Sequence, residues 1–127
     1  MKKILVIPLK IYRLNVVVCW EDPLEKFLKY ARNRGCSIPD DEIAGILNSA
    51  KGASGIAVTI GKESTDVLIW MKKRPRKASE YGTLYHELYH AVDNITETHN
   101  LTGEKEARAF IYEYLATECN KYFWSKK

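Results

Sequence analysis

The strongest constraint on the fold of this chain is the sequence His-Glu-Leu-Tyr-His at residues 86–90. Residues four apart on an α-helix lie one turn above each other, so His86 and His90 project from the same face. An apolar stripe recurs at helical spacing on another side of this segment: Leu84, Leu88, Val92 and Ile95. The pattern predicts a helix from about Ser79 to Ile95 that packs on one side and turns its histidines toward a cleft.

Two imidazoles on one helix face are typical of a metal site. Zinc binds histidine nitrogens, and a catalytic zinc site usually has three protein ligands and one open position. Glu87 is rotated about 100° from His86, so it can reach a water bound to the ion and act as a general base. A chain with 3 histidines rarely produces this spacing by chance. We therefore expect one zinc ion held by His86 and His90.

The third ligand is not fixed by the motif itself. A histidine six residues after His90 would indicate a metzincin, but Thr96 occupies that position, and Asp93 stands where the metzincin glycine is expected. His99 lies in a polar connector. Asp93 shares the histidine helix, so it is better placed to support the site or to cap local structure than to bind the ion.

The last predicted helix, about 103–122, offers four acids: Glu104, Glu106, Glu113 and Glu118. Glu106 stands among small and apolar residues, where an unpaired carboxylate is costly to bury, and this favours it as the third ligand. Glu104 is in the first turn, where an acid is favourable without any further role. Glu113 lies two turns beyond Glu106, either in a salt bridge or as an acceptor for a ligand histidine.

The rest of the sequence predicts an α+β domain. Strands are expected where β-branched residues gather: 3–9, 12–20, 54–61 and 65–73. Two further helices are expected at 22–35 and 39–52. Asp22 is a candidate cap for the first of these, and Gly35 ends it. The sequence shows no interdomain linker, so residues 1–127 are expected to form a single domain.

Composition narrows the class of protein. The net charge of +4 is mildly basic, and "KKRPRK" at 72–77 lacks interleaved aromatic residues, so nucleic acid is a disfavoured partner. The 3 cysteines form no C-x-x-C pair. Lys10 and Arg13 interrupt the apolar N-terminal run, and no stretch is long enough to span a membrane. We expect a cytoplasmic protein.

The motif HExxH, followed by E-A-x-A-F at 106–110, resembles the gluzincin metallopeptidases. The form "YGTLYHELYHAVDNI…EKEARAFIYEYL" is similar to the small phage- and mobile-element-type minigluzincins and to the ImmA/IrrE-like group. The resemblance covers about residues 79–116. It implies a small zincin-like domain, in which an antiparallel or mixed sheet packs against the histidine helix and a C-terminal glutamate helix. It also implies metal ligands His86, His90 and Glu106, and peptide hydrolysis with Glu87 as base.

Several points stay open at this level. The oxyanion partner of larger gluzincins has four candidates: Tyr81, Tyr85, Tyr112 and Tyr114. The strand at 65–73 could hold an extended peptide or protein substrate along its edge, or its residues Ile69, Trp70 and Met71 could be ordinary sheet core. A zinc-binding regulatory protein with little turnover is the alternative function, and a basic nucleic-acid module is a third.

Overall fold

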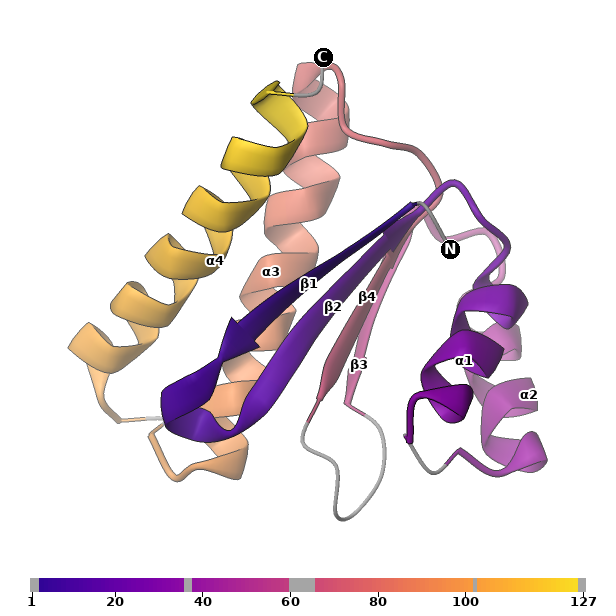
Figure 1. Ribbon diagram of the computed structural model, residues 1–127, viewed down its shortest axis with the longest axis horizontal. Helices are drawn as coiled ribbons and strands as arrows, with labels where there is room; N and C mark the ends of the chain where they lie inside the picture. The colour runs from indigo at the N-terminus through magenta and orange to yellow at the C-terminus, as the bar shows by residue number, and fades with distance from the viewer. Residues whose placement is uncertain (1–2, 36–37, 60–65, 102, 126–127) are drawn as a thin grey trace.

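The computed structural model describes residues 3–35, 38–59, 66–101 and 103–125, and it shows a four-stranded sheet between two pairs of helices (Figure 1). The strands are β1 (Ile4–Leu9), β2 (Leu14–Trp20), β3 (Gly55–Thr59) and β4 (Val67–Met71). The α-helices are α1 (Leu24–Asn33), α2 (Asp40–Ser49), α3 (Ala78–Thr98) and α4 (Lys105–Ser125). The predicted α+β class with a mixed sheet is confirmed.

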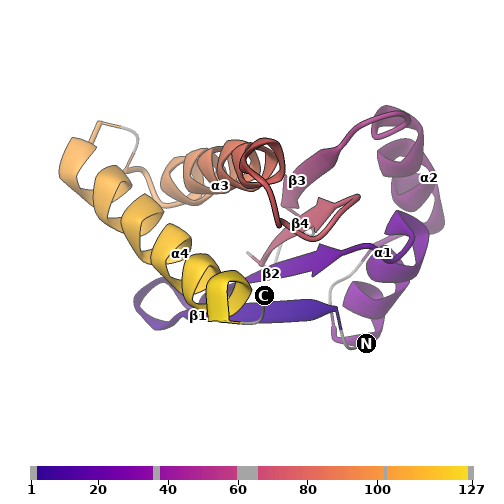
Figure 2. The same cartoon turned by 90° about the horizontal axis from the view of Figure 1, so that it is seen from above.

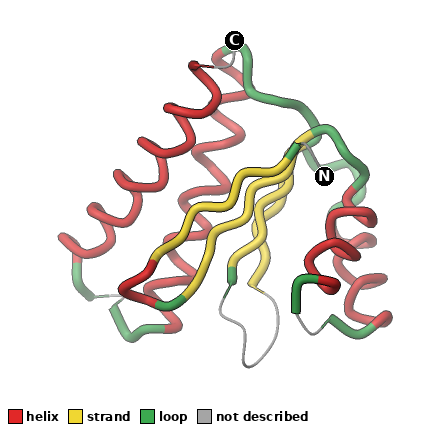
Figure 3. The backbone as a smooth tube through the Cα atoms, in the orientation of Figure 1, coloured by secondary structure: helices red, strands yellow, loops and turns green. Residues whose placement is uncertain are grey.

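The strands follow the order β1-β2-β4-β3 (Figure 3). β1 and β2 are antiparallel and are joined by a short 3-10 helix, η1 (Lys10–Tyr12). β4 runs parallel to β2 and antiparallel to β3. The sequence predicts that the strands at 54–61 and 65–73 are joined by a polar turn as a hairpin, and the antiparallel pairing of β3 with β4 confirms it. The connection at 60–65 lies outside the described residues. Because the chain leaves β2 through α1 and α2 and returns at the far side of β4, β3 is one edge strand of the sheet, and β1 is the other.

This topology corrects the prediction that the strand at 65–73 borders a cleft. β4 lies between two other strands, and its side chains serve as core on both faces. Ile69 and Met71 are buried beneath α3 and α4. Trp70 packs on the opposite face, where its indole Nε1 donates to the backbone oxygen of Asp22 at 2.7 Å. The alternative interpretation of these three residues as sheet core is confirmed.

The two faces of the sheet carry separate apolar cores. On one face, β1, β2 and β4 pack against α3 and α4, and on the other against α1 and α2 (Figure 2). Leu24, Phe27, Leu28 and Ala31 form the buried face of α1, as predicted. The prediction that Asp22 caps this helix is wrong, because Pro23 is the capping residue and no side chain bonds the helix start. Gly35, with φ of +104°, follows the helix end.

Helices α3 and α4 lie side by side and run antiparallel (Figure 1). Near the end of α3, the Arg108 guanidinium pairs with Asp93 and donates to Thr96 Oγ1 at 2.7 Å. Nearer its start, the Tyr85 hydroxyl donates to Asn120 Oδ1 at 2.7 Å. These two links fix the register between the helices. The register determines which α4 residues lie level with the histidines.

Two further sequence-based expectations concern cysteines and membranes. Cys19 and Cys119 are free, buried thiols, and burial raises the pKa of each to about 12. Cys36 lies outside the described residues. Among the helices of the described ranges, none combines the length and the apolar character that a bilayer crossing requires.

Candidate metal centre

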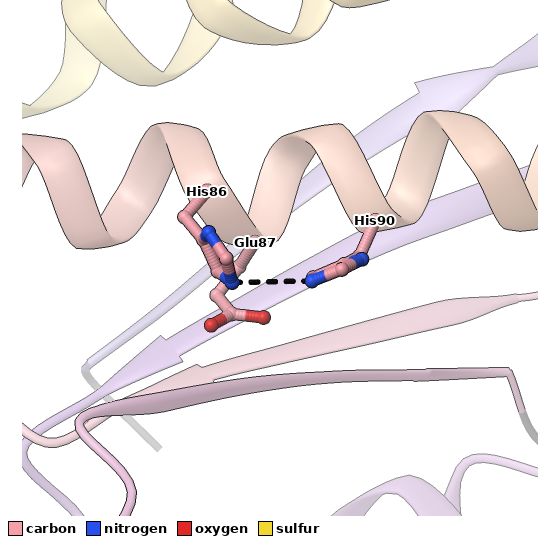
Figure 4. A group of neighbouring side chains, drawn as sticks. All are labelled: His86, Glu87 and His90. Carbon is pink, nitrogen blue, oxygen red and sulfur yellow. Dashed lines mark hydrogen bonds between the residues drawn. The ribbon is translucent and has the colours of Figure 1, made fainter.

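The two histidines of α3 converge on a single point. Their Nε2 atoms lie 3.1 Å apart, and both rings project from the exposed side of the helix (Figure 4). With Zn–N bonds of about 2.0–2.1 Å, this separation corresponds to an N–Zn–N angle of about 100°, near the tetrahedral value. The i, i+4 spacing therefore produces the side-chain geometry that the sequence predicted.

Glu87 completes the group. One ligand atom from each of His86, Glu87 and His90 lies within 4.8 Å of the others, so the three residues could hold a metal ion. Glu87 is only 6% exposed, and it lines the open crevice between α3 and β3. Burial raises its carboxyl pKa, and the charges of the two neighbouring histidines oppose that shift. Moving a carboxylate out of water is costly, and a nearby cation offsets that cost.

Gly55 makes room for this carboxylate. A Cβ atom at Gly55 would lie 3.1 Å from Glu87 Cγ and 3.2 Å from Glu87 Oε2. It would also lie 3.1 Å from Thr83 Cγ2. Because β3 begins with glycine, its backbone can approach α3 closely, and Glu87 is held between the helix and the edge strand (Figure 4).

The result is an open crevice of about 360 Å³ between α3 and β3. The strand contributes Gly55, Ile56 and Ala57, and the helix contributes the three residues of the motif and Asn94. Since β3 is the edge strand, its outer backbone groups lie beside the histidines. An extended chain could pair with this strand and present its own backbone to the metal group.

Glu106 does not join this group. It is exposed in the first turn of α4, and the neighbouring Ala109 and Phe110 are also exposed, so the expectation that Glu106 is buried among apolar residues is wrong. Helix α4 lies on the other side of α3 from β3 (Figure 2). The assignment of Glu106 as the third metal ligand stays a prediction, and this arrangement of the helices does not support it.

The helix register explains the position of Glu106. Arg108 lies opposite Asp93 and Asn120 opposite Tyr85, so the part of α4 level with the histidines is about residues 111–119, which include Glu113. Glu106 is seven residues earlier, about 10 Å along the axis at 1.5 Å per residue. Glu113 is exposed on nearly the same face of α4. The sequence pattern alone could not supply this register, because it depends on contacts between the two helices.

The other candidates serve structural contacts. His99 lies at the end of α3, with Nδ1 2.9 Å from the Ile95 carbonyl oxygen and its ring against Tyr12. Asp93 neither supports the histidines nor caps the helix, since it pairs with Arg108. Glu104 is exposed.

The four candidate tyrosines also lie away from the crevice. The Tyr85 hydroxyl binds Asn120, and the Tyr114 hydroxyl donates to the Pro8 carbonyl oxygen at 3.3 Å. Tyr81 and Tyr112 pack against the core that α3 and α4 share, and burial raises the pKa of both.

Sequence reasoning missed Gly55 and Asn94 as crevice residues. A glycine at the start of a strand pattern is a signal for close backbone approach, but only the sheet order shows that α3 is what approaches. The helical wheel places Asn94 on the histidine side, since it follows His90 by four residues.

The fold and the site together define a class: a small α+β domain with a two-histidine, one-glutamate group between a helix and an edge strand. Comparison of this chain with protein-family models, with curated proteins and with solved structures finds no match.

Proposed function

We propose that this protein is a zinc-dependent peptidase that cleaves an extended peptide or protein segment laid along β3. The observation that carries the proposal is the pair of Nε2 atoms 3.1 Å apart, with the buried Glu87 carboxylate beside them. Imidazole ligands suit zinc better than the hard, oxygen-preferring cations. The gluzincin resemblance of the motif supports the same reaction.

The chain's own residues would divide the work as follows. His86 and His90 would hold the ion, which would supply Lewis-acid chemistry toward a carbonyl oxygen and a water. Glu87 accepts the proton from the attacking water and delivers it to the leaving amine. The backbone of β3 aligns the peptide by strand pairing, which keeps the scissile carbonyl beside the histidines.

A metal-binding protein with little turnover is the second candidate. Two observations favour it: the described metal group contains no side chain from α4, and none of the four tyrosines faces the crevice. A site without a third ligand or an oxyanion partner would bind zinc more weakly and stabilise the transition state less.

The variant Glu87→Gln tests the proposal. Glutamine keeps the shape of the side chain and removes the base, so zinc binding should persist while hydrolysis falls by about 10²–10⁴-fold. The measurement is cleavage of a mixed peptide library by mass spectrometry, with zinc content determined on the same samples. Thr98→Ala, at the exposed end of α3, is the control.

The two candidates give different results in that experiment. Hydrolysis by the wild type that disappears in Glu87→Gln supports the peptidase. Full zinc occupancy with no cleavage of any library peptide by the wild type supports the second candidate. Equal cleavage by both proteins would exclude Glu87 as the base.

A further inference from the structure

A second cavity, of about 350 Å³, lies at the entrance to α3. Three lysines line it, Lys72, Lys73 and Lys77, together with the hydroxyl residues Ser54, Ser79 and Thr83. We call this cavity the lysine pocket. Cations and hydroxyl donors around one cavity form a surface complementary to an anion.

The lysines of the pocket are available to a ligand. Among the described residues, none of the three forms an ion pair. One acid, Glu80, also lines the pocket: its Oε1 accepts the backbone N–H groups of Arg76 and Lys77 at 3.0 and 3.1 Å, and its charge interacts with Lys73 and Lys77. Three lysines against one carboxylate leave a net positive charge around the cavity, and this charge supplies the attraction for an anion.

The lysine pocket adjoins the crevice of the metal group. Ser54 of the pocket directly precedes Gly55 of the crevice, and the Lys72 backbone N–H donates to the Ser54 carbonyl oxygen at 2.9 Å. Thr83 Cγ2 approaches the same Cβ position of Gly55 as Glu87 Cγ, and Thr83 stands one turn before Glu87 on α3. The two cavities therefore adjoin at this contact, and we call the pair the groove along the start of β3.

Helix geometry gives the spacing along this groove. The α3 residues of the pocket centre near Glu80 and the histidines centre near residue 88, which is about 12 Å at 1.5 Å per residue. An extended peptide advances about 3.3 Å per residue, so this distance corresponds to three or four residues. The opposite end of the histidine face carries an exposed acid, Glu97, so the charge along α3 is asymmetric.

We propose that the lysine pocket binds a carboxylate of the peptide held along β3, three to four residues from the carbonyl at the histidines. The peptide part of this inference rests on the proposed function. Antiparallel pairing is the slightly more stable arrangement, and it directs the C-terminal end of the peptide toward Gly55. The carboxylate is then an acidic side chain on that side of the cleavage point, or the C-terminus itself.

Binding of defined peptides to Glu87→Gln tests the proposal, because this variant should hold a peptide without cleaving it. The probe is a fluorescein-labelled nine-residue peptide of alternating threonine and alanine with a C-terminal amide. One version carries Glu at position 7, the second Gln at position 7, and the third Gln with a free C-terminal carboxylate. Fluorescence anisotropy should show the Glu version or the free acid binding about tenfold tighter than the Gln amide.

Two variants with the same net charge distinguish binding in the lysine pocket from attraction by the overall charge of the protein. Changing Lys72, Lys73 and Lys77 together to Gln should abolish the tenfold preference. The control changes Lys10, Lys51 and Lys105, which are exposed outside the pocket, and should retain it. Equal losses in the two triple variants would overturn the proposal, as would equal binding of all three peptides or no binding at about 1 mM.

Two further measurements distinguish a failure of this inference from a failure of the proposed peptidase function. The measurements are repeated on metal-free wild-type protein, where carboxylate preference should persist even if the protein proves to lack peptidase activity. A peptidase without carboxylate preference would overturn this inference alone. A labelled single-stranded 12-nucleotide DNA is the last probe. If it binds more tightly than every peptide and depends on the same lysines, the pocket binds phosphate and the carboxylate assignment is wrong.

Discussion

Helices α3 and α4 have the same length of 21 residues and pack against each other, yet their polar residues have different surroundings. On α3, the polar residues of the histidine face meet the edge strand β3 and form a crevice. On α4, Glu106 and Glu113 face away from the core and are exposed. The difference follows from position: α3 packs beside the edge strand β3, whereas α4 lies on the other side of α3, over β1 at the opposite edge of the sheet (Figure 2).

The comparison teaches that a metal group needs more than suitable residues on a helix. The histidines of α3 converge because four-residue spacing is a property of the helix itself. An acid from α4 can join them only if two helices meet in one particular register. That register is set by the Arg108–Asp93 and Tyr85–Asn120 contacts, which are far apart in sequence.

Zinc binding should show the largest contrast between the two helices. We expect His86→Ala to weaken zinc affinity by more than about 100-fold, beyond the loss that follows removal of a supporting residue. Glu106→Ala and Glu113→Ala should each change affinity by less than about tenfold, with the larger effect at Glu113, because Glu113 is level with the histidines. Competition with a zinc chelator gives the affinities.

The contrary result would be equally informative. If Glu106→Ala loses zinc as completely as His86→Ala, the sequence-based assignment is right. Helix α4 would then have to shift its register by about 10 Å, or two turns, when the ion binds. The zinc-induced rise in unfolding temperature, measured for each variant, provides an independent check, since a ligand stabilises only the state that binds it.

Much of the molecule could be predicted from local patterns. The strands and helices, the buried face of α1 and the convergence of His86 and His90 depend on residues within one or two turns of each other. The order of the strands could not be predicted, because it depends on where the chain returns after α2. For that reason the local pattern is compatible with β4 as an edge strand, and it does not place Gly55 beside the histidine helix.

Stability should show the next largest contrast. Leu88, on the core side of α3, is 0% exposed, whereas Phe110, on α4, is 70% exposed. Leu88→Ala should lower the free energy of unfolding by about 2–5 kcal/mol, because it leaves a cavity in the shared core. Phe110→Ala should change it by less than about 0.5 kcal/mol. Urea denaturation of both variants gives the two values.

That pair of variants also tests how the helices are packed. A large loss in Phe110→Ala would show that this side chain is covered in solution, either by another molecule or by a different packing of α4. Such a result would remove the argument that α4 is placed with its acids exposed, and with it the expected ranking of Glu113 above Glu106.

The smallest expected effect concerns how the start of α3 is tied to the sheet. Glu21, directly after β2, accepts a hydrogen bond from Arg76 at 3.2 Å and pairs with Lys3 at 3.3 Å. Burial alone would raise the pKa of Glu21, but the hydrogen bonds from Arg76, Lys3 and the Arg74 backbone outweigh it and lower the pKa. A lowered carboxyl pKa stabilises the folded state above the unfolded-state pKa, and this stabilisation is lost as pH falls through the folded-state value.

Glu21→Gln should therefore destabilise the protein by no more than about 1 kcal/mol at neutral pH, since both pairs are largely exposed to solvent. The difference between wild type and variant should begin to shrink as pH falls below the ordinary glutamate pKa of about 4.3, where the carboxyl of the unfolded state becomes protonated, and it should vanish below the lowered folded-state pKa. Salt should reduce it as well. Urea denaturation at a series of pH values measures this difference, and a gap that stays constant down to pH ~2 would show that Glu21 acts through its shape and not its charge. In that case apolar packing, and not charge, holds the start of α3 against the sheet, as it holds the core face of the same helix.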